Sequence, residues 1–146
     1  MARALLFALI VILAPRGWAE DVPLERCDRL FVVRATTGAK KLLLLVDTGA
    51  TRLYLQSNLI KALGLHRESE VQSKTTNGVR RRAVFEPVRL ELMGRNGVFQ
   101  VVEIDDDVPN LLGQIPLEYL DFVVDPRGQK LIPNPAHGDK QMSEEY

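Results

Sequence analysis

The residues best suited to chemistry are Asp47, Thr48, Gly49 and Ala50, which directly follow the apolar run 42–46. A buried strand that ends in a carboxylate, a hydroxyl and a glycine delivers one acid to a defined position. Gly49 would let the backbone pass close to that acid and to a ligand. The alternative without a function is an ordinary turn, in which the aspartate side chain hydrogen-bonds the backbone a few residues on. The segments around this tetrapeptide must decide between the two interpretations.

Most of the elements that would position Asp47 are predicted to be short strands, with Leu42–Val46 buried on both faces because it is apolar throughout. A short helix is expected from an N-cap at Ser57 to a stop at Gly64, and another at 115–120 with Pro116 in its first turn. Residues 20–29 are charged and are expected to be irregular. Strands are predicted at residues 30–33, 42–46, 53–55, 71–75, 79–92, 98–104, 110–113, 122–125 and 130–132.

Two turn signals divide the middle of the chain into hairpins. Asn77-Gly78 is the strongest two-residue hairpin signal available, and Gly94–Gly97 marks a second turn. The chain shows no internal repeat and no interdomain linker. Many short strands with one or two short helices predict an all-β domain that closes into a barrel.

Three motifs later in the chain favour a functional role for Asp47 over an ordinary turn. They are Leu111-Leu112-Gly113-Gln114-Ile115-Pro116-Leu117-Glu118, Val124-Asp125-Pro126 and Asn134-Pro135. Together with Asp47-Thr48-Gly49 they resemble the retropepsin-like aspartic proteases, and in particular the small single-domain prokaryotic members, over residues 28–136. The resemblance implies a retropepsin-like closed β-barrel that acts as a homodimer.

The chemistry of that family explains the residue types. One carboxylate takes a proton from a water molecule while a second, protonated carboxyl donates to the scissile carbonyl. Two carboxylates in close contact resist double ionisation, so they share one proton, as is well known for aspartic proteases. With 146 residues and one Asp-Thr-Gly, this chain is too short for two lobes. We therefore expect a homodimer with Asp47 of each subunit on the two-fold axis.

The resemblance also implies roles for residues beside the acid. Thr48 would hydrogen-bond across the dimer interface, and Ala50 would keep the loop small beside the substrate. Leu111, Leu112 and Gly113 would form the strand that crosses near the active-site loop. The hairpin tip Asn77-Gly78 would be a flap over an extended peptide substrate. Viral members often carry acids that grip the substrate where this chain has Thr51 and Arg52, and arginine where it has Gln114.

Composition and the N-terminal segment bear on which partners the protein binds and where in the cell it is found. Nineteen basic and nineteen acidic residues give zero net charge, which does not favour a nucleic-acid partner. The single cysteine, Cys27, excludes an internal disulfide and a cysteine metal cluster. Residues 1–19 resemble a signal peptide cleaved after Ala19, or an uncleaved anchor, so the domain is expected to be exported or membrane-anchored. Residues 137–146 are expected to form a disordered tail.

We interpret the remaining polar clusters as solvent-exposed surface rather than as binding sites. Asp105–Asp107 is expected to be a solvated loop rather than a cation site. Arg80–Arg82 is expected to be a solvated strand face rather than a site for acidic substrates. His66 and His137 are far apart and lack cysteine or histidine neighbours in the sequence, so no metal-ligand or Ser-His role is expected for them. The resemblance to aspartic proteases implies an enzyme that needs no metal and no organic cofactor.

Three functions stay open at this point. The first is an aspartic endopeptidase that cleaves peptides or proteins with Asp47 as its catalytic residue. The second is a non-catalytic retropepsin-like module for peptide binding or assembly. The third is a plain structural protein.

Overall fold

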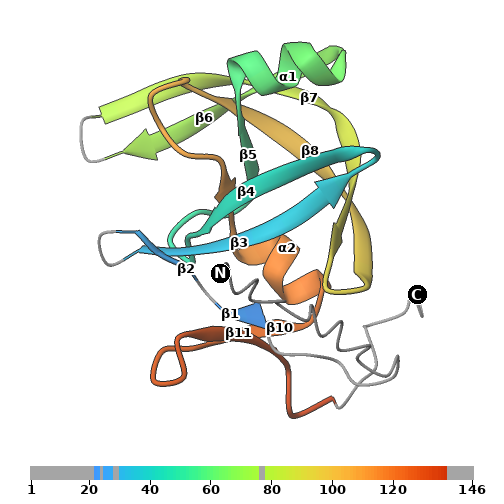
Figure 1. Ribbon diagram of the computed structural model, residues 1–146. Helices are drawn as coiled ribbons and strands as arrows, with labels where there is room; N and C mark the ends of the chain where they lie inside the picture. The colour runs from blue at the N-terminus through green and yellow to red at the C-terminus, as the bar shows by residue number, and fades with distance from the viewer. Residues whose placement is uncertain (1–21, 24, 28–29, 76–77, 138–146) are drawn as a thin grey trace, which may run out of the picture.

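The computed structural model describes residues 22–23, 25–27, 30–75 and 78–137, as eleven strands and two short helices (Figure 1). The helices are α1 (Ser57–Leu63) and α2 (Gln114–Tyr119). The strands are β1 (Val22–Pro23), β2 (Glu25–Cys27), β3 (Leu30–Thr37), β4 (Lys40–Val46), β5 (Leu53–Gln56), β6 (Arg67–Thr75), β7 (Gly78–Leu92), β8 (Arg95–Ile104), β9 (Leu111–Leu112), β10 (Phe122–Asp125) and β11 (Lys130–Pro133).

Six of the strands close a barrel. Their order is β3-β4-β9-β5-β8-β7, and the pair between Thr36 and Glu91 joins β7 back to β3. A separate sheet of order β1-β11-β10 lies below the barrel in Figure 1. The predicted all-β fold, a closed barrel with two short helices, is therefore confirmed. Closure satisfies the backbone of strands that would otherwise present open edges.

Strand β4 is buried on one face and partly open on the other. Leu42 and Leu44 are buried in the barrel core, whereas Leu43 between them is 53% exposed. The prediction of a strand buried on both faces was therefore wrong. Successive side chains of a strand point to opposite faces, and no other layer among the described residues covers the outer face at Leu43. The other fully buried side chains of the core include Leu53, Leu55, Leu90, Val101 and Leu112.

The segment before the barrel is not irregular, as its charge had suggested. Two short strands form there: β1 pairs antiparallel with β11, and β2 pairs antiparallel with β3. The prediction of an irregular segment at 20–29 was wrong for these residues. Strand β1 pairs with β11, about a hundred residues later in the chain. Such a two-residue strand is too short to show the alternation of apolar and polar side chains by which strands are recognised in a sequence.

Helix α1 begins one residue earlier than its predicted cap implied. Its N-cap is Gln56, and the hydroxyl of Ser57 donates to Glu103 Oε1 (2.7 Å) rather than capping the helix. The N–H of Asn58, in the first turn of the helix, instead donates to Oδ1 of Asp106 (2.9 Å), which lies in the loop after β8. The predicted end is confirmed: Gly64 adopts the left-handed conformation (φ 69°) that ends helices.

Strand β7 is long enough to serve two parts of the fold. Its first half pairs with β6 in a hairpin, and its second half pairs with β8 and β3 in the barrel. The register with β8 shifts between Phe85 and Val88, a stretch that contains Pro87. Proline has no N–H to donate, so it is tolerated at such a bulge. Beyond the bulge Val84 and Phe85 still pair with β8, and residues 78–83 pair with β6.

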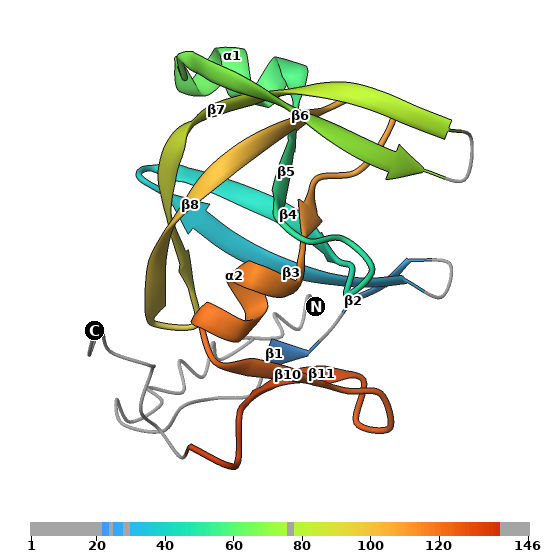
Figure 2. The same cartoon turned by 180° about the vertical axis from the view of Figure 1, so that it is seen from behind.

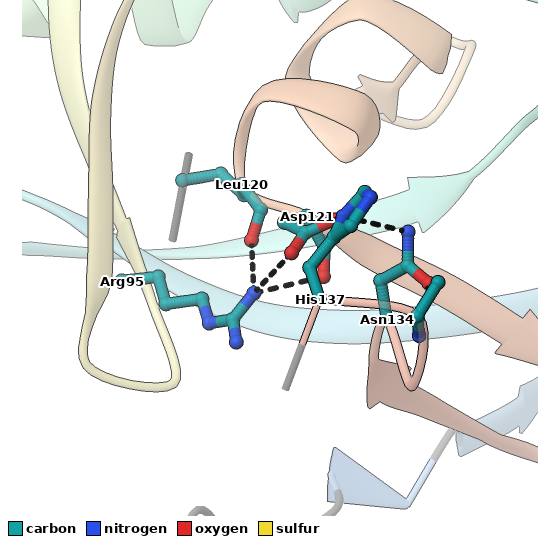
Figure 3. A network of polar contacts seen from close by, with 6 residues as sticks. Arg95, Leu120, Asp121, Asn134 and His137 are labelled. Atoms are coloured by element: carbon teal, nitrogen blue, oxygen red, sulfur yellow. Dashed lines mark hydrogen bonds and ion pairs between the residues drawn. The ribbon is translucent and has the colours of Figure 1, made fainter. Parts of the chain in front are cut away.

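A buried ionic network fastens the barrel to the segment that follows it. The carboxylate of Asp121 is 3% exposed and lies 3.7 Å from Arg95 Nη1, which also donates to the carbonyls of Leu120 and Asp121 at 2.8 Å (Figure 3). The ring of His137 reaches Asp121 Oδ1 at 2.8 Å, and the N–H of Asn134 donates to the Asp121 carbonyl. His137, the first residue of the predicted tail, is thus held in place. Residues 138–146 lie outside the described residues.

The predicted leader, residues 1–19, also lies outside the described residues. In the part of the chain that is described, neither helix has the length and apolar character needed to cross a membrane.

Replacing Arg95 with leucine should destabilise the fold strongly. The substitution leaves the buried Asp121 carboxylate without its guanidinium, a loss that costs about 3–5 kcal/mol in comparable pairs. The matched control is Arg89→Leu on the neighbouring strand, where Arg89 bonds Asn96 at an exposed position; there we expect a change within about 0.5 kcal/mol. Urea denaturation of both variants measures the difference. Equal free energies of unfolding would contradict the structural role of the network.

Candidate functional site

Asp47 stands at the end of β4, where a parallel strand fixes its backbone. β9 pairs parallel with β4 on one side and antiparallel with β5 on the other. The N–H of Asp47 donates to the carbonyl of Leu112 (3.0 Å), one residue beyond the last pair of the β4–β9 ladder. The predicted apolar segment Leu111-Leu112 is therefore beside the predicted acid, although more than sixty residues separate them in the sequence.

The side chain of Asp47 is oriented by the loop that it begins. The N–H of Gly49 donates to Asp47 Oδ1 (2.9 Å), and the N–H of Ala50 donates to the Asp47 carbonyl (3.0 Å). A Cβ on Gly49 would lie 3.2 Å from Asp47 Oδ1, so glycine leaves that oxygen unobstructed. Asp47 and Ala50 are half-buried, whereas Thr48 and Gly49 are exposed. The tip of the loop is thus available at the surface of the chain.

Gly113 is the closest backbone contact of the site. Its N–H donates to the carbonyl of Arg52 (3.0 Å), and the next two N–H groups donate to the carbonyls of Ala50 (2.8 Å) and Thr51 (3.0 Å). A Cβ on Gly113 would lie 2.4 Å from the Arg52 carbonyl oxygen and 2.7 Å from that of Ala50. No side chain fits there, so only glycine allows the two segments to approach so closely.

A groove of about 560 Å³ lies over Asp47. Its floor includes Asp47, Gly49 and Ala50, and one wall is formed by residues 71–74 of β6. Figure 2 shows the β6–β7 hairpin and the loop between β4 and β5 on the same side of the molecule. The remaining lining residues are Thr51, Arg52, Tyr54, Arg82, Ile104 and Leu111. Asp47 is the single carboxylate among these described residues.

The β6–β7 hairpin whose tip was predicted to be a flap contributes residues 71–74 and Arg82 to the groove, and the flap role of Asn77-Gly78 stays a prediction. Thr75 pairs with Gly78 at the end of the β6–β7 hairpin, and Gly78 has a positive φ of 114°, which favours glycine. Asn77 lies outside the described residues. Strands β6 and β7 of the hairpin therefore line the same cavity as Asp47.

Several residues of the groove were not selected as site residues by sequence reasoning, among them Lys74, Arg82 and Tyr54. For Arg82 a signal existed. A two-residue turn at 76–77 sets the hairpin register, and this register puts Arg82 opposite Val71, as observed. Arg82 was expected on a solvated face, but its side chain is only 15% exposed. No pattern marked Tyr54, which follows the first residue of β5.

The other polar candidates lie away from the groove or act in turns. His66 is exposed, and its backbone N–H and ring bond Glu86 Oε1 at 3.1 Å. These hydrogen bonds, the backbone one first, hold the pKa of Glu86 below its ordinary value. Asp125 accepts from the N–H groups of Arg127 and Gly128 and so holds the turn between β10 and β11.

The loop 105–107 is exposed, as predicted, and two of its aspartates make contacts with other elements. Asp105 lies 3.3 Å from Arg82 and 3.6 Å from Arg80, and Asp106 caps α1. Within residues 30–75 and 78–137, no three side chains of His, Cys, Asp or Glu gather as a metal-ligand set.

Comparison with known proteins gives a single finding. The family model described as aspartyl protease matches residues 33–114, which is more than half of the chain. The matched range runs from β3 through the Asp47 loop and the hairpin to Gln114, the first residue of α2. No curated protein matches the chain.

Substitution of Gly113 by alanine should destabilise the fold by about 3 kcal/mol or more, because the methyl group overlaps backbone atoms that cannot move independently. Gly64→Ala is the matched control. Gly64 also has a positive φ, but a Cβ there meets nothing within 4 Å, so only the conformational cost of about 1–2 kcal/mol remains. Chemical denaturation followed by circular dichroism compares the two. A Gly113→Ala variant as stable as Gly64→Ala would contradict the close approach.

Proposed function

Because the chain belongs to the retropepsin-like aspartyl protease family, we propose that it is an aspartic endopeptidase that is active as a homodimer. Its catalytic residue is Asp47, and the reaction is hydrolysis of a peptide bond by a water molecule held between two copies of that carboxylate. The proposal names no metal and no organic cofactor.

The observation that carries the proposal is the placement of one carboxylate on the floor of a groove. The described lining of that groove contains Asp47 and no other acid. Acid-base hydrolysis of this type needs two carboxyl groups, one to accept a proton and one to donate. A second copy of the chain, related by a two-fold axis, supplies the missing group through the exposed loop of Thr48 and Gly49.

The loop geometry suits this role. The N–H of Gly49 holds Asp47 Oδ1, so the plane of the carboxylate is set before substrate binds. In the proposed reaction the ionised Asp47 takes a proton from water as the water oxygen attacks the scissile carbonyl carbon. The protonated partner Asp47 donates its proton to the carbonyl oxygen. The C–N bond of the resulting diol then breaks: the first Asp47, now protonated, gives its proton to the leaving nitrogen, and the ionised partner Asp47 takes a proton from one diol hydroxyl, so the pair again holds one proton.

The shape of the groove supports an extended peptide substrate. The β6–β7 hairpin forms one wall, and Thr51 and Arg52, which follow the Asp47 loop, also line the groove. A peptide strand between two such walls can be held by main-chain hydrogen bonds, which do not depend on its side chains.

Asp47→Asn should abolish hydrolysis while leaving the fold intact. An amide cannot take a proton from water at neutral pH, so kcat should fall by about 10³-fold or more. Asp107→Asn is the control, since Asp107 is exposed in the loop after β8 and does not line the groove. Peptide and casein cleavage by the purified proteins give the comparison. Equal activity of the wild type and Asp47→Asn would end the assignment.

The shared site also predicts that activity follows dimerisation. Specific activity should fall on dilution in step with the dimer fraction measured by sedimentation velocity. Mixing the wild type with excess Asp47→Asn should reduce activity further, because heterodimers carry only one acid. A strict monomer that cleaves peptides would contradict the two-copy site.

The rival function is a non-catalytic peptide-binding or assembly module. The two functions separate with a peptide analogue that carries a hydroxyl in place of the scissile carbonyl. A protease binds such a mimic of the tetrahedral intermediate at least about 10²-fold more tightly than the matching peptide. Equal affinity, measured by calorimetry, would favour the binding module.

A further inference from the structure

The groove over Asp47 is rich in positive charge. Three of its lining residues are cationic: Arg52 from the Asp47 loop, Lys74 from β6 and Arg82 from β7. They stand against one carboxylate, that of Asp47. The chain as a whole has zero net charge, so this concentration is local.

The hairpin that forms the wall carries the same sign along its outer end. Residues 71–85 include four basic side chains, Lys74 and Arg80–Arg82, and no acidic one. Asp105 is placed between Arg80 (3.6 Å) and Arg82 (3.3 Å), so a single negative charge serves two guanidinium groups. The described part of the hairpin's outer end therefore keeps a positive excess.

Arg52 and Lys74 are not neutralised by a direct ion pair within the described residues. Arg52 Nη1 donates to the uncharged side-chain oxygen of Gln100 (3.3 Å), and Gln100 in turn donates to Glu68 (3.1 Å). The amide of Gln100 thus separates the guanidinium from that carboxylate. For Lys74, no carboxylate in residues 30–75 and 78–137 lies within ion-pair distance of the amine.

We propose that this groove selects peptide substrates with an aspartate or glutamate side chain close to the scissile bond. The inference rests on the proposed protease function and names its substrate class. Guanidinium and ammonium groups bind carboxylates through charge-assisted hydrogen bonds, which are about twice as strong as neutral ones. A carboxylate in the groove would meet Arg52 and Lys74, whereas a substrate lysine would meet like charges.

The test uses the full-length dimer and a peptide library in which each of three positions on either side of the scissile bond is Glu, Gln or Lys. We expect kcat/KM to fall in the order Glu, Gln, Lys at one or more positions, with about tenfold between successive residues at partly screened contacts. Raising the salt concentration should compress these ratios. Equal kcat/KM for the three side chains at every position would overturn the proposal.

Charge reversal identifies the residues responsible. In Arg52→Glu/Lys74→Glu the order should invert in favour of lysine, and in the milder Arg52→Gln/Lys74→Gln it should flatten. Arg127→Glu, in the turn between β10 and β11 and outside the groove lining, should keep the wild-type order. An unchanged preference in both double variants that fold, judged by circular dichroism, would also overturn the proposal.

Peptide binding to Asp47→Asn separates the two proposals. If that variant prefers the Glu peptide but the wild type cleaves nothing, the charge selectivity holds and the protease function fails. If the wild type cleaves all three peptides equally and Asp47→Asn binds them equally, the protease function holds and the charge selectivity fails.

Discussion

The site depends on a short backbone ladder between two segments far apart in the sequence. Asp47 bonds Leu112, and the loop carbonyls of Ala50, Thr51 and Arg52 accept from the three N–H groups that begin at Gly113. These bonds are all between backbone groups, and the Asp47 side chain adds one more by accepting from the N–H of Gly49. The ladder exists only because position 113 has no Cβ. The barrel can be regarded as the frame that brings the two segments into register.

A second constraint is the division of β7. The pairing of β7 with β8 is broken between Phe85 and Val88, a stretch that includes Pro87, and it ends at Val84, so residues 78–83 of β7 pair with β6 alone. The β6–β7 hairpin therefore extends past the end of the β7–β8 ladder, and its strands line the groove over Asp47. The Asp47 loop and the hairpin are set by different features, one a glycine that permits close backbone approach and the other the point at which the β7–β8 ladder ends.

The parts that sequence reasoning predicted are those with a local signal. Asp47 after an apolar run, Gly113 after Leu111-Leu112 and Gly64 as a helix stop can each be found from neighbours along the chain. What failed depended on partners distant in sequence. The exposure of Leu43 depends on which layer covers β4, and β1 depends on β11 for its pairing. The buried Arg95–Asp121 network gave no signal either, because isolated charged residues usually lie at the surface.

In the proposed dimer the two-fold axis has a further consequence for specificity. Every groove residue occurs twice, once on each side of the scissile bond, so one chain cannot give the two sides different walls. A positive wall on one side therefore implies a positive wall on the other, and a single substitution alters both. The one place where charge must differ between the copies is the pair of Asp47 carboxyls, which share a proton. Asymmetry in such a site comes from that proton and from the direction of the peptide, not from the protein chain.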